Sequence, residues 1–212
     1  MFVKQGVAAM LNVMFGVFYL ACGVAEIDQK PAAEVAEVVA DAEPAAKPAG
    51  DGTTLSVDLA KSSIGFIGAK ISDSHTGEFQ SFEGSITVED GVVVATDFSI
   101  DMTSLEADKA KLTKHLLGDD FFDVVQFPTT KFSGKVVAAA NEGGPQNTTG
   151  VLTLHGVEKE ISFPVTVSMD GTVVKVNSEF KINRQDFGVS YPGRPDDLIK
   201  DDVAIVLDLS FN

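Results

Sequence analysis

The stretch Glu160-Ile161-Ser162-Phe163-Pro164-Val165-Thr166-Val167-Ser168-Met169 alternates between polar and apolar positions from end to end. Successive side chains of a β-strand point to opposite faces, so this alternation places every apolar side chain on one face. Asp170-Gly171 follows directly, and residues 172–182 resume the alternation. An Asp-Gly pair between two alternating segments is a strong hairpin signal. The region therefore predicts two antiparallel strands that share one apolar face.

The same pattern recurs along most of the chain. Segments with alternating or strand-like composition are 55–59, 63–71, 78–88, 92–102, 129–137, 148–155 and 203–211. Further turn signals are Asp90-Gly91 and Asn141-Glu142-Gly143-Gly144. Short turns between neighbouring strands predict an up-and-down antiparallel order, because parallel strands would need helical crossovers. Such strands can form either a barrel or a sandwich, since both require one apolar face per strand.

One helix is expected within this β pattern. Thr103-Ser104-Leu105-Glu106 has the form of a capping box, with Thr103 as the N-cap residue and Glu106 reaching back. We therefore predict a helix over 104–117 that ends at Gly118.

The N-terminal segment has the composition of a targeting signal. A single charge, Lys4, precedes an apolar run over 6–21, and the run ends in Leu20-Ala21-Cys22. This ending resembles a bacterial lipobox, which predicts a lipoprotein-type signal peptide over 1–22 with Cys22 as the acylated lipid anchor. The alternative is an uncleaved anchor, because 5–25 is long enough to span a bilayer. Both interpretations predict an extracytoplasmic, membrane-anchored protein in the periplasm or at the cell surface.

Composition divides the rest of the chain into a linker and one domain. Residues 23–52 are rich in Ala and Pro and strongly acidic, which predicts a disordered tether with a reach of about 30 Å. Residues 53–212 then form the β domain. The net charge of the 212-residue chain is −15, which excludes nucleic acid as a partner because phosphates would be repelled. A single Cys excludes an internal disulfide and a Cys-rich zinc site.

No motif for catalysis or for a resident cofactor is found. The sequence lacks a Gly-x-Ser-x-Gly elbow, a His-Glu-x-x-His pair, a Cys-x-x-Cys pair and a Walker loop. His75, His115 and His155 are far apart, so we expect ordinary polar roles for them rather than a metal site, with His155 facing outward. The acidic pairs at 196–197 and 201–202 lack the alternate spacing of a calcium loop, which favours a solvated loop. We therefore expect no catalytic residues, no metal and no cofactor.

Several longer motifs cover nearly all of 54–212. They are Gly77-Phe79-Phe82-Gly84, His115-Leu116-Leu117-Gly118-Asp119-Asp120-Phe121-Phe122-Asp123, Phe127-Pro128, Lys131-Phe132, Gly150-Val151-Leu152-Thr153-Leu154-His155-Gly156-Val157, Asn183-Arg184-Gln185-Asp186-Phe187-Gly188-Val189 and Asp202-Val203-Ala204-Ile205. These motifs resemble those of YceI-like proteins. The resemblance implies an all-β fold, an antiparallel eight-stranded lipocalin-like barrel with one short helix. It also implies a long apolar pore that holds a polyisoprenoid or similar amphiphile, in a periplasmic or secreted protein.

Candidate binding residues follow from the apolar faces and the few cations. Arg184 is a candidate for contacting the head group of a ligand, and its alternative role is to pair with Asp186. Lys114 and His115 belong to the densest basic spot of the domain, which is either a positive rim for a head group or a solvated helix face. The expected pore lining, each member of which could equally be packed core, is Phe66, Phe98, Ile100, Phe132, Leu152, Leu154, Phe163, Val165 and Phe180.

These features favour a membrane-tethered lipid-binding protein that is not an enzyme. Its expected role is to transport, store or sequester a polyisoprenoid or other long-chain lipid. Each buried CH₂ contributes about 0.8 kcal/mol, so a few isoprene units give tight binding without many polar contacts. The alternative is a ligand-free structural or adhesion module on a lipid tether. The expected partners are the lipid and the membrane, and a homodimer is left open.

Overall fold

The computed structural model describes residues 27–38, 52–137 and 146–212. Its helices include α2 (Ala110–Leu116) and the 3-10 helices η1 (Leu59–Lys61), η2 (Met102–Ser104) and η3 (Arg184–Phe187), and residues 27–29 are also helical. The strands are β1 (Glu34–Glu37), β2 (Thr53–Ser56), β3 (Ser63–Ala69), β4 (Ser74–Phe79), β5 (Phe82–Glu89), β6 (Val92–Asp101), β7 (Leu105–Ala107), β8 (Thr129–Val137), β9 (Gln146–Leu154), β10 (Val157–Asp170), β11 (Val173–Asn183), β12 (Gly193–Arg194), β13 (Asp197–Leu198) and β14 (Asp202–Phe211).

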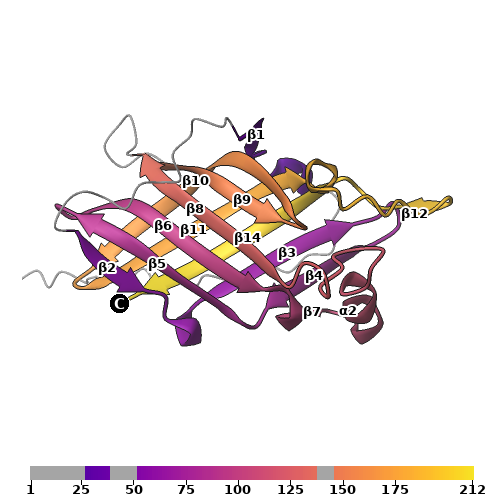
Figure 1. Ribbon diagram of the computed structural model, residues 1–212, viewed down its shortest axis with the longest axis horizontal. Coiled ribbons are helices and arrows are strands. Elements are labelled where there is room, and N and C mark those ends of the chain that lie inside the picture. Colours follow the sequence, from indigo (N-terminus) through magenta and orange to yellow (C-terminus); the bar gives the residue numbers. More distant parts are fainter. Residues whose placement is uncertain (1–26, 39–51, 138–145) are drawn as a thin grey trace, which may run out of the picture.

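One strongly curled antiparallel sheet forms most of the molecule (Figure 1). Its strand order is β2-β5-β6-β8-β9-β10-β11-β14-β3-β4-β7, with β1 paired to β10 beside this path. Strands β12 and β13 form a separate two-stranded sheet. Strands β8 to β11 follow one another in both the sequence and the sheet, and so do the pairs β3–β4 and β5–β6, as the predicted up-and-down order requires. Elsewhere the order differs, because β2 joins β5 and β14 joins β3.

The predicted hairpins are present where the sequence can be compared with the structure. Asp90-Gly91 joins β5 to β6, and Asp170, the last residue of β10, and Gly171 lead into β11. Both glycines adopt positive φ, +77° for Gly91 and +62° for Gly171, which glycine allows at little cost. The predicted turn at 141–144 lies outside the described residues.

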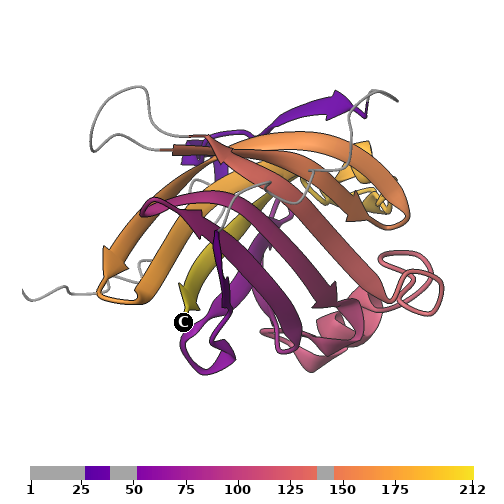
Figure 2. The same ribbon diagram turned by 60° about the vertical axis from the view of Figure 1, so that its left-hand side comes forward.

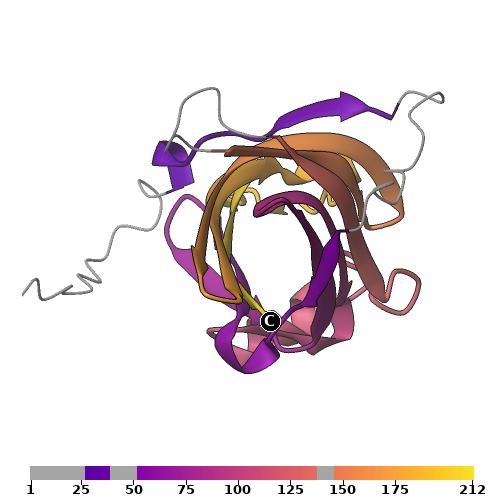
Figure 3. The same cartoon turned by 90° about the vertical axis from the view of Figure 1, so that its left-hand side faces the viewer.

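The sheet curls around a single interior, as the view along it shows (Figure 3). Beyond β2, the Val57 N–H donates to the carbonyl of Gly84, and Val57 also bridges to Phe211 of β14. One sheet wrapped in this way, also visible from the side in Figure 2, is a curled-sheet architecture rather than two stacked sheets. The predicted count of eight strands is not confirmed, because twelve strands of the described chain join this sheet.

The predicted helix over 104–117 is wrong at its N-terminal end. Residues of η2 and β7 occupy its first turns, and α2 begins only after Lys109. Thr103 is not an α-helical N-cap, since its N–H donates to Asp101 Oδ1 at 2.9 Å within η2. Leu105 is 1% exposed in β7, which pairs with β4. The backbone partners and burial provided by β4 outweigh the local capping signal.

Part of the predicted linker is also wrong. Residues 34–37 form β1, which pairs antiparallel with residues 159–162 of β10. Ile27 is fully buried against Ala69 and Ala204. The segment 27–38 therefore packs on the domain, and residues 39–51 lie outside the described part of the chain.

Candidate ligand-binding cavity

A cavity of about 640 Å³ lies inside the curled sheet. Small-molecule sites typically measure about 300–1,000 Å³, so this space is large enough for a ligand. Its walls are mostly aliphatic and aromatic side chains from the inward faces of the strands. All nine residues expected to line a pore do line this cavity, namely Phe66, Phe98, Ile100, Phe132, Leu152, Leu154, Phe163, Val165 and Phe180.

Glycines opposite aromatic residues keep the interior open. Gly77 is the cross-strand partner of Phe66, and Gly84 is the partner of Phe98. A Cβ atom on Gly77 would lie 2.4 Å from the Phe66 ring, and one on Gly84 would lie 2.5 Å from the Phe98 ring. The rings therefore occupy the space above the glycines, along the wall. Glycine inside a strand often marks such a close approach, and this was the sequence signal that could have located the pairs.

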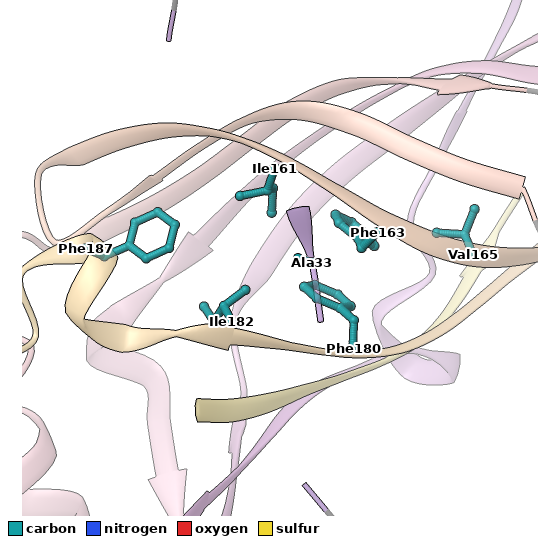
Figure 4. Close-up of a cluster of buried hydrophobic side chains, with 7 residues drawn as sticks. All are labelled: Ala33, Ile161, Phe163, Val165, Phe180, Ile182 and Phe187. Atoms are coloured by element: carbon teal, nitrogen blue, oxygen red, sulfur yellow. The ribbon is translucent and has the colours of Figure 1, made fainter. Parts of the chain in front are cut away.

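The lining residues Phe163 and Phe180 also belong to a packed cluster (Figure 4). Their rings stack with centroids 4.0 Å apart and planes 12° apart. Phe132 packs against Phe163 at 5.5 Å. Phe163 is 5% exposed and Phe180 is 4% exposed. Phe163 and Phe180 therefore line the cavity and also belong to the packed core.

Most of the charged lining gathers near α2 and β12, which lie at the same end of the molecule (Figure 1). Lys111, His115, Tyr191 and Arg194 line the cavity there. The His115 ring meets the Tyr191 ring edge-on at 4.9 Å, and its Nε2 lies 3.1 Å from Asp120 Oδ2. His115 thus lies at the cavity wall, and its contact with a head group stays a prediction.

Lys114, by contrast, is exposed and is not part of the cavity wall. Its neighbour on α2, Lys111, is exposed yet lines the cavity, as does Arg194. Neither Lys111 nor Arg194 has an ion-pair partner among the described residues. Sequence reasoning assigned no role to Arg194, because nothing in its local sequence marks it as part of the cavity wall.

Other cations at this end are paired with carboxylates. Lys109 Nζ lies 3.2 Å from Asp73 Oδ2, and Lys70 pairs with Asp197. The hydrogen bond from Lys109 holds the pKa of Asp73 below its usual value, and the hydrogen bond from Lys70 does the same for the pKa of Asp197. These pairs connect the loop after β3 to the start of α2 and to β13.

Arg184 lies at the cavity wall but is 4% exposed, and its guanidinium is already hydrogen-bonded inside the protein. Nε donates to the Lys200 carbonyl at 3.1 Å, and Nη1 donates to the Val189 carbonyl at 2.5 Å. Nη2 donates to Asp201 Oδ1 at 3.0 Å, so the carboxylate partner is Asp201 and not Asp186. Burial lowers the pKa of Arg184, and Asp201 opposes that effect. These bonds hold η3 against the chain before β14.

The other two histidines have local roles. His75 Nδ1 lies 3.1 Å from Asp108 Oδ1. His155 forms the turn between β9 and β10 with φ of +52°, and its ring packs on Phe127 at 4.5 Å. Its Nδ1 lies 3.3 Å from the Phe187 carbonyl, so the prediction that His155 faces outward is wrong. No group of three His, Cys, Asp or Glu residues within the described ranges could hold a metal ion.

The predicted anchor lies outside the described residues, which begin at 27. Among the helices that the structure describes, none has both the length and the apolar composition needed to cross a membrane.

Similar proteins share this architecture. The chain is 31% identical over 137 residues to a UPF0312 protein of Pseudomonas putida strain W619, covering 61% of this chain and 71% of that protein. The crystal structure of Burkholderia cenocepacia BcnA matches with a TM-score of 0.66 and 25% identity, covering 73% of this chain and 98% of BcnA. A polyisoprenoid-binding domain from Saccharophagus degradans, implicated in plant cell wall breakdown, matches with a TM-score of 0.61 and 18% identity over 74% of this chain and 97% of that domain.

The match to a family profile covers the curled sheet almost completely. Residues 55–211 match the YceI-like domain, and this span includes every strand of the cavity wall. The chain belongs to the YceI-like family.

Proposed function

We propose that this protein binds a polyisoprenoid or similar long-chain lipid in the cavity and carries, stores or sequesters it without chemical change. The observation that carries the proposal is an apolar cavity of about 640 Å³ that the Phe66–Gly77 and Phe98–Gly84 pairs leave open. The Saccharophagus degradans domain with the same fold is described as polyisoprenoid-binding, which supports this class of ligand.

The cavity wall can supply the binding energy through apolar contact alone. Each CH₂ group removed from water contributes about 0.8 kcal/mol, so an isoprene chain of a few units suffices. Lys111, His115, Tyr191 and Arg194 would then lie beside the polar end of the lipid, because they gather at one end of the wall. Among the Lys and Arg residues of the cavity wall, Lys111 and Arg194 are the two that pair with no carboxylate of the described chain.

The proposal includes a membrane tether. Acylation at Cys22 would hold the domain outside the cytoplasm and beside a lipid surface, where an exchangeable lipid is available. The lipobox-like ending of the apolar N-terminal run supports this part of the proposal.

The direct test is to identify what the purified protein contains. The full chain is produced in several expression hosts, extracted with organic solvent and analysed by mass spectrometry. We expect a long-chain isoprenoid at close to one molecule per protein. Leu152→Trp, which adds bulk inside the cavity, should lower that amount, whereas Val92→Trp at an exposed position should not. Absence of stoichiometric lipid from every host would contradict the proposal and favour the ligand-free structural module.

A further inference from the structure

The sheet contains a seam between β10 and β11. Their ladder joins only residues 166–170 to 173–177, although both strands continue well beyond it. The break begins near Pro164, which has no N–H to donate to a neighbouring strand. The Pro164 carbonyl instead accepts a hydrogen bond from Ser178 Oγ at 2.5 Å. Past this point, the ring pair Phe163–Phe180 spans the seam on the cavity side.

Residues 31–37, here called the strap, fill this seam from outside. The Lys181 N–H donates to the Pro31 carbonyl, and the Ala33 N–H donates to the Lys181 carbonyl, both at 2.9 Å. The strap then crosses to β10 and pairs with residues 159–162. It thus bonds to β11 with its first residues and to β10 with its last. Ala33 lies among Phe163, Phe180 and their neighbours (Figure 4).

The strap and the residues just before it are attached mainly by shallow contacts. Apart from Ile27 and Ala33, the side chains of 27–38 are half-buried or exposed. Ion pairs join Lys30 to Glu179, Glu37 to Lys159, and Asp28 to Lys200, the last at 3.0 Å. The carboxylates in these pairs are 52% to 83% exposed. The lysines in these pairs are 17% to 29% exposed. Ion pairs with one exposed partner are screened by salt, so this part of the attachment weakens as ionic strength rises.

We propose that the strap is a removable cover over a lateral portal, and that lipid enters and leaves the cavity between β10 and β11. This rests on the proposed lipid-binding function. Phe163 and Phe180 line the cavity directly behind the seam. A long apolar chain that enters here meets aromatic and aliphatic groups. Entry at the α2 end would instead bring it past Lys109, Lys111 and Arg194.

The test is to lock the strap with a disulfide. Ala36 and Glu160 are direct cross-strand partners, and Ala36→Cys with Glu160→Cys ties β1 to β10. The matched control is Glu83→Cys with Ser99→Cys, partners in the β5–β6 ladder away from the seam. Both pairs are made in the full chain carrying Cys22→Ser, which removes the native thiol. Transfer of tritiated geranylgeraniol from phosphatidylcholine vesicles is followed by rapid capture of the protein.

We expect the oxidised lock to slow both uptake and release by about tenfold or more, because exchange needs the locally opened state. Affinity should change little, and reduction of the disulfide should restore the rates. Lys159→Glu with Lys200→Glu repels Glu37 and Asp28 and should speed exchange, with the greatest difference at low salt. Lys131→Glu with Lys135→Glu makes the same charge change at exposed positions of β8 and should have no such effect.

The outcomes separate the portal from the binding function. Normal affinity with unchanged rates in the oxidised lock would overturn the portal and leave lipid binding intact. Equal slowing by the β5–β6 control disulfide would also overturn it. If the unlocked chain takes up no geranylgeraniol and contains no extractable lipid, the binding function itself fails.

Discussion

Phe163 has a packed side and an open side. Its ring stacks on Phe180 and touches Phe132, yet it also borders the cavity. Phe187 belongs to the same cluster, is fully buried and is not part of the cavity wall. Comparing substitutions at Phe163 and Phe187 therefore separates the stability contribution of a cavity-lining ring from that of a fully packed ring.

We predict that Phe163→Ala destabilises the lipid-free protein less than Phe187→Ala does. A packed Phe→Ala change costs about 3–5 kcal/mol, and a ring beside open space loses fewer contacts. Added geranylgeraniol should widen the gap in stability between wild type and Phe163→Ala, because a ligand stabilises the folded state according to its affinity. Denaturant titrations with and without the lipid measure both effects. A full core-sized penalty for Phe163→Ala, unchanged by lipid, would place this ring in solid packing.

At the scale of strand pairs, the width of the cavity depends on residues that face each other across β3–β4 and β5–β6. Phe66 and Phe98 each lie over a glycine of the neighbouring strand. A larger residue at either glycine would occupy the space of the ring. The ring would then have to move, and it would move into the cavity because that is the open space beside it.

We predict that Gly84→Ala weakens lipid binding by several-fold up to about tenfold. Displacing the Phe98 ring would exclude one or two CH₂ groups of the ligand, worth about 0.8 kcal/mol each. Gly68→Ala is the control, because Gly68 also lines the cavity but has no atom within 4 Å of an added Cβ. Equilibrium titration with geranylgeraniol compares the two variants. Equal affinities would show that the Phe98–Gly84 pair does not set the usable width.

For the whole molecule, the packing of residues 27–38 on the domain shortens the free chain between the domain and an anchor at Cys22. The tether predicted over 23–52 would allow a reach of about 30 Å. Because Ile27 is buried, an anchor at Cys22 is connected to the domain by five residues, which span at most about 17 Å. An acylated chain would therefore hold the curled sheet close to the lipid surface.

We predict that Cys22→Ser leaves the precursor uncleaved and without the added mass of acyl chains, since a hydroxyl cannot replace the thiol in that transfer. Ala25→Ser, a polar change nearby, should be processed like wild type. Detergent-phase partitioning and intact-mass measurement of both variants check the result. Normal processing of Cys22→Ser would contradict acylation and favour a spanning helix or an ordinary secretory signal.

Local patterns in the sequence determined the strands, the hairpins and the apolar faces. Period-two alternation indicates which side of a strand is buried, as at Phe163 and Val165. Asp-Gly pairs indicate where the chain turns. These signals act over a few residues, so they can be recognised without knowing the neighbouring strands. For the same reason, the expected lining residues could be named before their cavity was known.

Tertiary structure alone decided the features that depend on distant partners. Leu105 lies in β7 and not in the predicted helix, because β4 provides its strand with backbone partners and buries its side chain. The strap was predicted as part of the linker but packs on the sheet, because β10 and β11 separate beside Pro164 and leave it backbone partners. Arg184 pairs with Asp201 and not with Asp186, which is nearer in sequence, because η3 turns the Arg184 guanidinium toward the chain before β14. In each case the deciding contact lies far along the chain, and its energy exists only once the curled sheet has formed.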